Sequence, residues 1–125
     1  MQPEIRHKLA AVEFYTDERC YIRELANIDA DPAASIAQAR VRTGATTRWH
    51  RLAGITERYV LLSGSGRVEV GDLRPQVVGA GDVVLIPPGC PQRIACLGDE
   101  DLVFLAICTP RFRNEAYQDI DPEPL

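Results

Sequence analysis

The sequence predicts a single all-β domain that closes into a barrel or a two-sheet jelly roll, with helix confined to the ends of the chain. Three observations predict this class. The chain has 125 residues, which is enough to bury one hydrophobic core but hardly two. Apolar and polar residues alternate in short runs between about residues 19 and 108, as they do in half-buried strands. Glycine, proline and aspartate separate these runs, which is typical of sandwiches and barrels.

The alternating runs define the expected strands. They cover residues 35–41, 47–52, 57–62, 67–70, 83–86, 92–96 and 102–108. Turns are expected at Gly64–Gly66, Gly71–Asp72, Gly81–Asp82, Pro87–Gly89 and Gly98–Asp99. The pattern therefore predicts one domain over residues 1–125, with a barrel core over about 19–110.

The two ends of the chain depart from this pattern. Ile5–Val12 could form a short helix, and Asn114–Tyr117 a helical turn. The acidic tail Asp119–Leu125 contains two prolines and is expected to be extended or frayed. Only 6% of the residues are aromatic, so the core is expected to be largely aliphatic.

Charge and cysteine usage exclude several classes of protein. The formal net charge is −4, and 14 basic residues are scattered among 18 acidic ones. No basic stripe is available for nucleic acid or for an anionic membrane. The first ten residues contain no apolar segment of the kind found in signal peptides, so a cytoplasmic location is expected. The four cysteines form no C-x-x-C pair and are expected to be free thiols.

Two motifs carry a family resemblance. In the first, five residues separate Gly44 from His50, and Glu57 and Gly64 follow at successive intervals of seven. The second begins at Gly81 and reads G-D-V-V-L-I-P-P-G-C-P-Q. Together they resemble the two motifs of the cupin superfamily. The run L-V-F-L-A-I-C-T-P-R-F near the end is similar to small bacterial single-domain cupins. The resemblance implies a cupin β-barrel.

The chain departs from the cupin pattern at three positions. Leu52 stands where cupins carry the second histidine of H-x-H, Gln92 where the second motif carries histidine, and Cys96 where it carries asparagine. The resemblance implies a divalent metal ion, such as Mn, Fe, Ni or Zn, held by His50, Glu57 and Gln92. Such a site would have three protein ligands and open positions, which suit catalysis.

Strand geometry suggests how these residues meet. His50 and Leu52 are two residues apart and share a face of one strand. Glu57 opens the next strand, and antiparallel pairing of the two strands would place it beside His50. Gln92 must come from a strand distant in sequence. Without a metal, His50 and Glu57 would form a hydrogen-bonded acid–base pair in the cavity, or the polar residues would be merely structural.

The expected substrate pocket contains Arg48, Leu52, Tyr59 and Cys96. Arg48 precedes His50 by two residues and is expected to point the same way. Its guanidinium would bind a carboxylate or phosphate of the ligand, or form an ion pair within the protein. Tyr59 is either a hydroxyl donor or a core residue. The Cys96 thiol either lines the cavity or packs in the core.

The function expected is that of a metal-dependent enzyme acting on a small polar molecule, such as a sugar derivative or an organic acid. His50, Glu57 and Tyr59 are the catalytic candidates, and the reaction could belong to the isomerase, lyase or oxygenase class. Two alternatives stay open. One is a metal-free isomerase or dehydratase with His50 as base, and the other is a ligand-binding or sensor module without chemistry. A homodimer is expected because small barrels carry exposed sheet edges. Trp49 and Glu13–Ile28 are the candidate contacts, the latter as a strand added across subunits.

Overall fold

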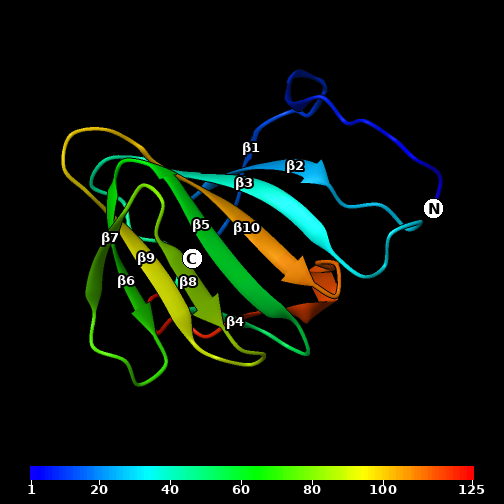
Figure 1. Ribbon diagram of the computed structural model, residues 1–125. Helices are drawn as coiled ribbons and strands as arrows, with labels where there is room; N and C mark the ends of the chain where they lie inside the picture. The colour runs from blue at the N-terminus through cyan, green and yellow to red at the C-terminus, as the bar shows by residue number, and fades with distance from the viewer.

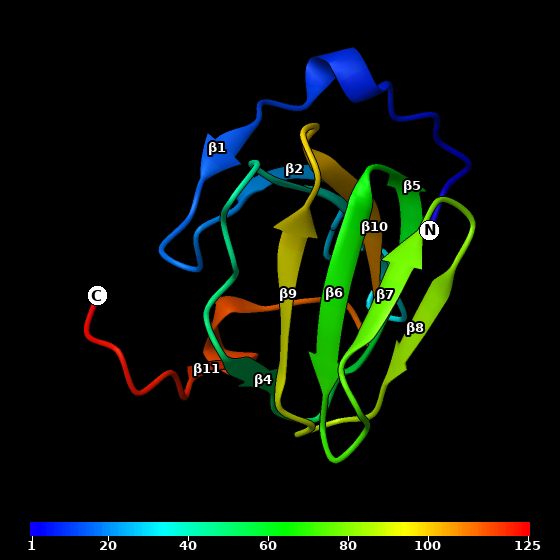
Figure 2. The same ribbon diagram turned by 90° about the vertical axis from the view of Figure 1, so that its left-hand side faces the viewer.

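The computed structural model describes residues 1–125 and consists almost entirely of antiparallel β-strands in two facing sheets (Figures 1 and 2). The strands are β1 (Phe14–Tyr15), β2 (Tyr21–Ala26), β3 (Ser35–Val41), β4 (His50–Leu52), β5 (Thr56–Ser63), β6 (Ser65–Val70), β7 (Gln76–Gly79), β8 (Val83–Ile86), β9 (Gln92–Leu97), β10 (Leu102–Thr109) and β11 (Tyr117–Asp119). One sheet has the order β1-β2-β3-β10-β5-β8, and the other β11-β4-β9-β6-β7. The predicted all-β fold is confirmed.

All seven alternating runs contain a strand, but four strands have no such signal. Every residue of β2 is half-buried, and the edge strand β7 is exposed or half-buried throughout, so neither alternates between buried and exposed positions. The two-residue β1 and the three-residue β11 are too short to show a period. These strands form because a neighbouring strand offers backbone hydrogen bonds, which the pattern of a single segment does not reveal.

The core lies between the two sheets, where alternate residues of each strand point inward. On β5 these are Glu57, Tyr59 and Leu61. The main core cluster is mostly aliphatic, as expected, with Tyr59 and Phe104 as its aromatic pair at 4.4 Å between ring centroids. A smaller, separate cluster of buried side chains is formed by Leu52, Ile55 and Cys108. These inward positions place the polar residues of β4, β5 and β9 within an apolar interior.

The predicted pairing of β4 with β5 is wrong. β4 lies in the five-stranded sheet, where His50 and Gln92 are Cα partners. β5 lies in the six-stranded sheet, where Glu57 is opposite Cys108 and Ile86. The connection at Ala53 to Ile55 therefore crosses from one sheet to the other instead of closing a hairpin. His50 and Glu57 face each other across the barrel rather than along one sheet.

Glycine is required at the turn between β5 and β6. Gly64 has a φ of +82°, in the left-handed region that side chains disfavour. A Cβ atom there would come within 2.6 Å of the Asp101 carbonyl oxygen. The turn brings the β5–β6 corner against the start of β10, which closes the end of the barrel away from the cavity described below.

The ends of the chain contain less helix than the sequence predicts. Within Ile5–Val12 only Lys8–Ala10 form a 3₁₀ turn, because the apolar side chains there are exposed and no packed face stabilises a longer helix. Asn114–Ala116 form the second 3₁₀ turn, close to the expected position. The segment Glu13–Ile28 contributes β1 and β2, which pair within the same chain. No helix is long and apolar enough to cross a membrane.

The C-terminal tail is anchored rather than frayed. The buried Arg48 guanidinium donates hydrogen bonds to the Asp119 carboxylate at 2.8 Å and to the backbone carbonyls of Glu123 and Pro124. The Trp49 backbone N–H donates to the Asp121 carboxylate at 2.8 Å. These contacts tie the tail to the two residues before β4. In Figure 2 the red end of the chain continues from β11, which lies beside β4, outward to the C-terminus.

Candidate active site

A cavity of about 330 Å³ opens at the end of the barrel where β10 ends and β5 begins. The five-stranded sheet contributes His50 and Leu52, and the six-stranded sheet contributes Glu57 and Cys108. The turn between β1 and β2 adds Glu18. This volume is at the low end of the range for ligand pockets, so the cavity suits a small molecule.

His50 presents one ring nitrogen to this cavity. The side chain is buried, and its Nδ1 lies 2.7 Å from the Arg48 carbonyl oxygen. A carbonyl only accepts, so Nδ1 carries the proton and the neutral ring keeps its lone pair on Nε2. The Nε2 atom lies 3.7 Å from the Glu18 carboxylate, and Tyr117 stacks on the ring. His50 is therefore held in the orientation and tautomer of a proton acceptor.

Glu57 is a buried carboxyl group without a fixed partner. Its Oε1 atom is fully buried and has no hydrogen-bond partner, while the Cys108 thiol lies 4.0 Å from Oε2. The pKa of Glu57 is raised to about 7, mainly by burial and to a smaller extent by Glu18, while His50 and the amide of Gln92 lower it. Glu57 therefore exchanges its proton near neutral pH, which is what a general acid or base requires.

Gln92 and Tyr59 form a hydrogen-bonded pair behind the cavity. The Tyr59 hydroxyl donates to Oε1 of Gln92. Burial raises the pKa of Tyr59 well above its usual value, so the hydroxyl stays protonated. The Nε2 group of Gln92 has no partner and is turned toward Glu57. The amide of Gln92 therefore presents a donor, not an acceptor, to Glu57.

The residues present do not fit the divalent metal that the cupin resemblance implies. The amide oxygen expected as a ligand is engaged by Tyr59, and the group that faces Glu57 is an N–H donor. Leu52 fills the next inward position of β4 with an apolar side chain. No three His, Cys, Asp or Glu side chains are grouped closely enough to hold a metal ion. A divalent ion needs several converging lone pairs, and this set of side chains does not supply them.

Of the residues expected in the substrate pocket, the structure places one in the cavity and the others elsewhere. Leu52 lines the cavity. Arg48 does not, because its guanidinium turns away to the C-terminal tail instead of pairing with Glu57 or facing a ligand. Cys96 points inward but lies in the main core, where its thiol contacts the Leu97 and Glu100 carbonyls toward the other end of the barrel.

Glu18 is the site residue that the sequence did not indicate. It lies in the turn between β1 and β2, and its carboxylate accepts a hydrogen bond from the Cys20 thiol at 3.1 Å. The Arg48 backbone N–H donates to the Glu18 carbonyl at 3.1 Å, which ties the turn to the strand that carries His50. The next residue, Arg19, has a φ of +71° and is the only non-glycine residue with positive φ. No motif marks such a contact between distant segments.

Fold and site together define a small double-sheet barrel with a polar pocket at one end. The sequence matches the cupin domain family over residues 38–108, and the chain belongs to this family. An uncharacterised protein of Methanocaldococcus jannaschii is 31% identical over 104 residues, which cover 82% of each chain.

Solved structures share the fold at low sequence identity. They include the nucleoside dehydratase Pac13, with a TM-score of 0.78, 14% identity, and coverage of 96% of this chain and 92% of that one. KdgF from Halomonas sp. has a TM-score of 0.78 at 13% identity, over 91% and 98% of the two chains. Oxalate decarboxylase from Bacillus subtilis has a TM-score of 0.80 at 20% identity, over 96% of this chain and 33% of that one. At these identities the likeness shows the fold alone.

Proposed function

We propose that the protein is an enzyme of small-molecule chemistry that eliminates water from its substrate, or isomerises it, by proton transfer between His50 and Glu57. The observation that carries this is the arrangement of the two groups. His50, with its lone pair on Nε2, and the buried carboxyl group of Glu57 line one cavity from opposite sheets. A base and an acid on opposite sides of a substrate are what such a reaction needs.

The elimination can be written without any further reactant. His50 Nε2 takes a proton from the carbon next to a carbonyl group, and the electron pair of that C–H bond forms the new double bond. The C–O bond on the neighbouring carbon breaks, and the hydroxide leaves as water with the proton of Glu57. The proton gained by His50 and the proton lost by Glu57 are then re-equilibrated with solvent. Pac13, which shares the fold, is a nucleoside dehydratase. A dehydration is therefore a reaction that this fold can host, which supports the proposal.

The reaction is tested by proton NMR in D₂O with a panel of small β-hydroxy ketones and aldehydes. We expect exchange of the proton next to the carbonyl, followed by loss of water. His50→Ala and Glu57→Gln should each slow turnover about 100-fold or more. The matched control His7→Ala removes an exposed imidazole and should leave the rate unchanged.

Two outcomes would replace this proposal. Turnover that requires an added divalent ion and stops with a chelator would restore the metal-dependent enzyme. Tight binding of small ligands with no exchange or turnover on any of them would favour a binding or sensor module.

A further inference from the structure

The cavity that holds His50 and Glu57 is lined by several acidic side chains and by no lysine or arginine. The four carboxyl groups that line it are those of Asp17, Glu18, Glu24 and Glu57. Elsewhere in the protein several half-buried charges are paired; Arg40, for example, contacts both Glu13 and Asp101. Among the residues that line the cavity, the carboxyl groups therefore have only the His50 imidazole as a basic neighbour.

One of these carboxyl groups also lacks a hydrogen-bond donor. Glu57 is only 8% exposed, and its Oε1 atom has no partner within the protein. An unpaired buried acceptor destabilises a folded protein unless something else satisfies it. The Glu57 side chain lines the cavity, and within the protein only the Gln92 amide is turned toward it, so a ligand that presents an N–H or O–H group fits this carboxyl group.

The nearest arginines do not line the cavity. Arg111 and Arg113 line an adjacent, more open depression, which shares Glu24 with the cavity. Arg111 donates to the Asn27 side-chain oxygen at 2.7 Å and to the Asp29 carboxylate at 2.8 Å. Burial raises the pKa of Glu24, and the charge of Arg111 lowers it to a smaller extent. An anionic ligand inside the cavity would therefore meet like charges and no cation other than a protonated His50.

The remaining walls are apolar and partly aromatic. Phe14, Phe112 and Tyr117 line the cavity, and Phe14 is 48% exposed. Aromatic faces attract organic cations as well as apolar groups. We infer that the ligand of this cavity is a small organic amine, bound as its ammonium ion through the carboxyl groups and through the aromatic walls, and not an organic acid or a phosphate.

This inference rests on the proposed function and names its substrate class. The ammonium group would contact Asp17, Glu18 and Glu24, while an uncharged part of the same molecule reaches His50 and Glu57. Charge preference is measured by binding and needs no turnover. A failure of the charge preference thus leaves the proton-transfer reaction standing, and the reverse is also true.

The test uses three probes of one shape and different charge: 2-phenylethylamine, 2-phenylethanol and phenylacetate. Isothermal titration at pH 7.5 measures their affinity for the full-length protein. The amine should bind about tenfold more tightly than the alcohol, because only the amine forms a partly buried ion pair. A tenfold ratio of affinities corresponds to about 1.4 kcal/mol of binding free energy. Phenylacetate should bind more weakly than the alcohol.

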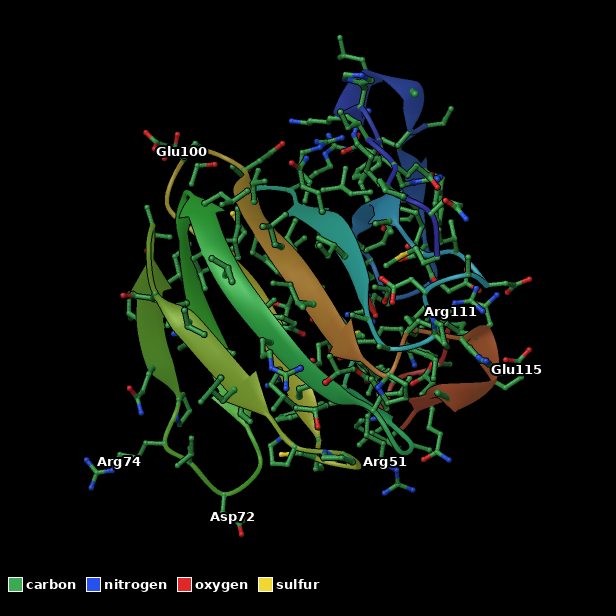
Figure 3. All side chains as sticks on the ribbon, turned by 45° about the vertical axis from the view of Figure 1, so that its right-hand side comes forward. Arg51, Asp72, Arg74, Glu100, Arg111 and Glu115 are labelled. Atoms are coloured by element: carbon green, nitrogen blue, oxygen red, sulfur yellow. The ribbon has the colours of Figure 1, made fainter.

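Two variants locate the effect. Asp17→Asn and Glu18→Gln should each weaken binding of the amine about three- to tenfold and leave binding of the alcohol unchanged. Asp17 makes no side-chain contact that the fold needs, so this variant keeps the test valid if Glu18→Gln unfolds. The matched control Glu100→Gln, in the loop at the other end of the barrel from Arg111, should change nothing (Figure 3). Phenylacetate binding as tightly as the amine, no binding of the amine, or an unchanged amine-to-alcohol ratio in Asp17→Asn would each overturn the inference.

Discussion

Glu57 connects the chemistry of the site to the stability of the protein. Its pKa is raised from 4.5 to about 7, mainly by burial. The folded state therefore holds this proton more tightly than the unfolded chain between pH 4.5 and 7, so stability should fall as pH rises through that window. The groups that face Glu57 are His50, Glu18, Gln92 and Cys108; His50 and Gln92 lower its pKa, but burial outweighs them and the sign is kept.

Glu57→Gln should remove this penalty. Compared with the unmodified protein, the variant should gain about 3 kcal/mol in its free energy of unfolding between pH 4 and pH 8. Urea denaturation at both pH values measures this, with Glu100→Gln as the exposed control. A difference between Glu57→Gln and the unmodified protein that is the same at both pH values would contradict the raised pKa.

The metal hypothesis can also be tested by substitution of single residues. Gln92→His together with Leu52→His would place three imidazoles on the two paired strands β4 and β9, with Glu57 opposite them. We expect this double variant to bind Ni²⁺ or Zn²⁺ in isothermal titration and to lose that binding when His50→Ala is added. The unmodified protein should show no such binding. Stoichiometric binding by the unmodified protein that disappears in His50→Ala would show that the metal hypothesis is right.

At the scale of elements, the turn between β1 and β2 determines where Glu18 lies. Thr16 and Cys20 close it through backbone hydrogen bonds, and Arg19 occupies the left-handed region within it. A residue other than glycine in that region costs about 1 kcal/mol. Arg19→Gly should therefore keep or raise the free energy of unfolding, by up to about 1 kcal/mol, because the Glu123 ion pair that it loses is exposed.

A β-branched residue at the same position should do the opposite. Arg19→Val should destabilise the protein by more than about 1 kcal/mol and weaken any ligand that depends on Glu18. Thermal denaturation of Arg19→Gly and Arg19→Val separates backbone strain from loss of the arginine side chain, since both variants lose it. Equal stability of the two variants would mean that the turn is not strained.

At the scale of the whole molecule, the homodimer stays a prediction, and the exposed apolar residues of one sheet edge give a way to test it. On the edge strand β8, Val83 is 55% and Leu85 69% exposed, and on the neighbouring β5 Leu62 is 44% exposed. An exposed apolar edge is a site of association between chains. We expect a dimer in sedimentation velocity at micromolar concentration and a monomer for Leu85→Lys. A monomer for the unmodified protein would show the prediction to be wrong.

Much of the architecture could be predicted from the sequence because its causes are local. Alternation of apolar residues marks which side of a strand is buried, and residues such as Gly64 mark turns that only glycine adopts comfortably. The same alternation predicted that Glu57 and Tyr59 share an inward face, and β5 has that face buried. The spacing of Gly44, His50 and Glu57 resembled the family to which the chain belongs.

The make-up of the site was decided by tertiary structure. Whether β4 pairs with β5 or faces it depends on which strands compete for each edge, and the two-residue alternation is the same in both cases. Glu18 reaches His50 only because the β1–β2 turn is bound to Arg48. The pKa of Glu57 depends on how much water the closed barrel excludes around it. By itself the sequence determined strands, turns and family, since these follow from neighbouring residues; the tertiary structure decided which charges share the cavity, since burial and distance depend on the whole chain.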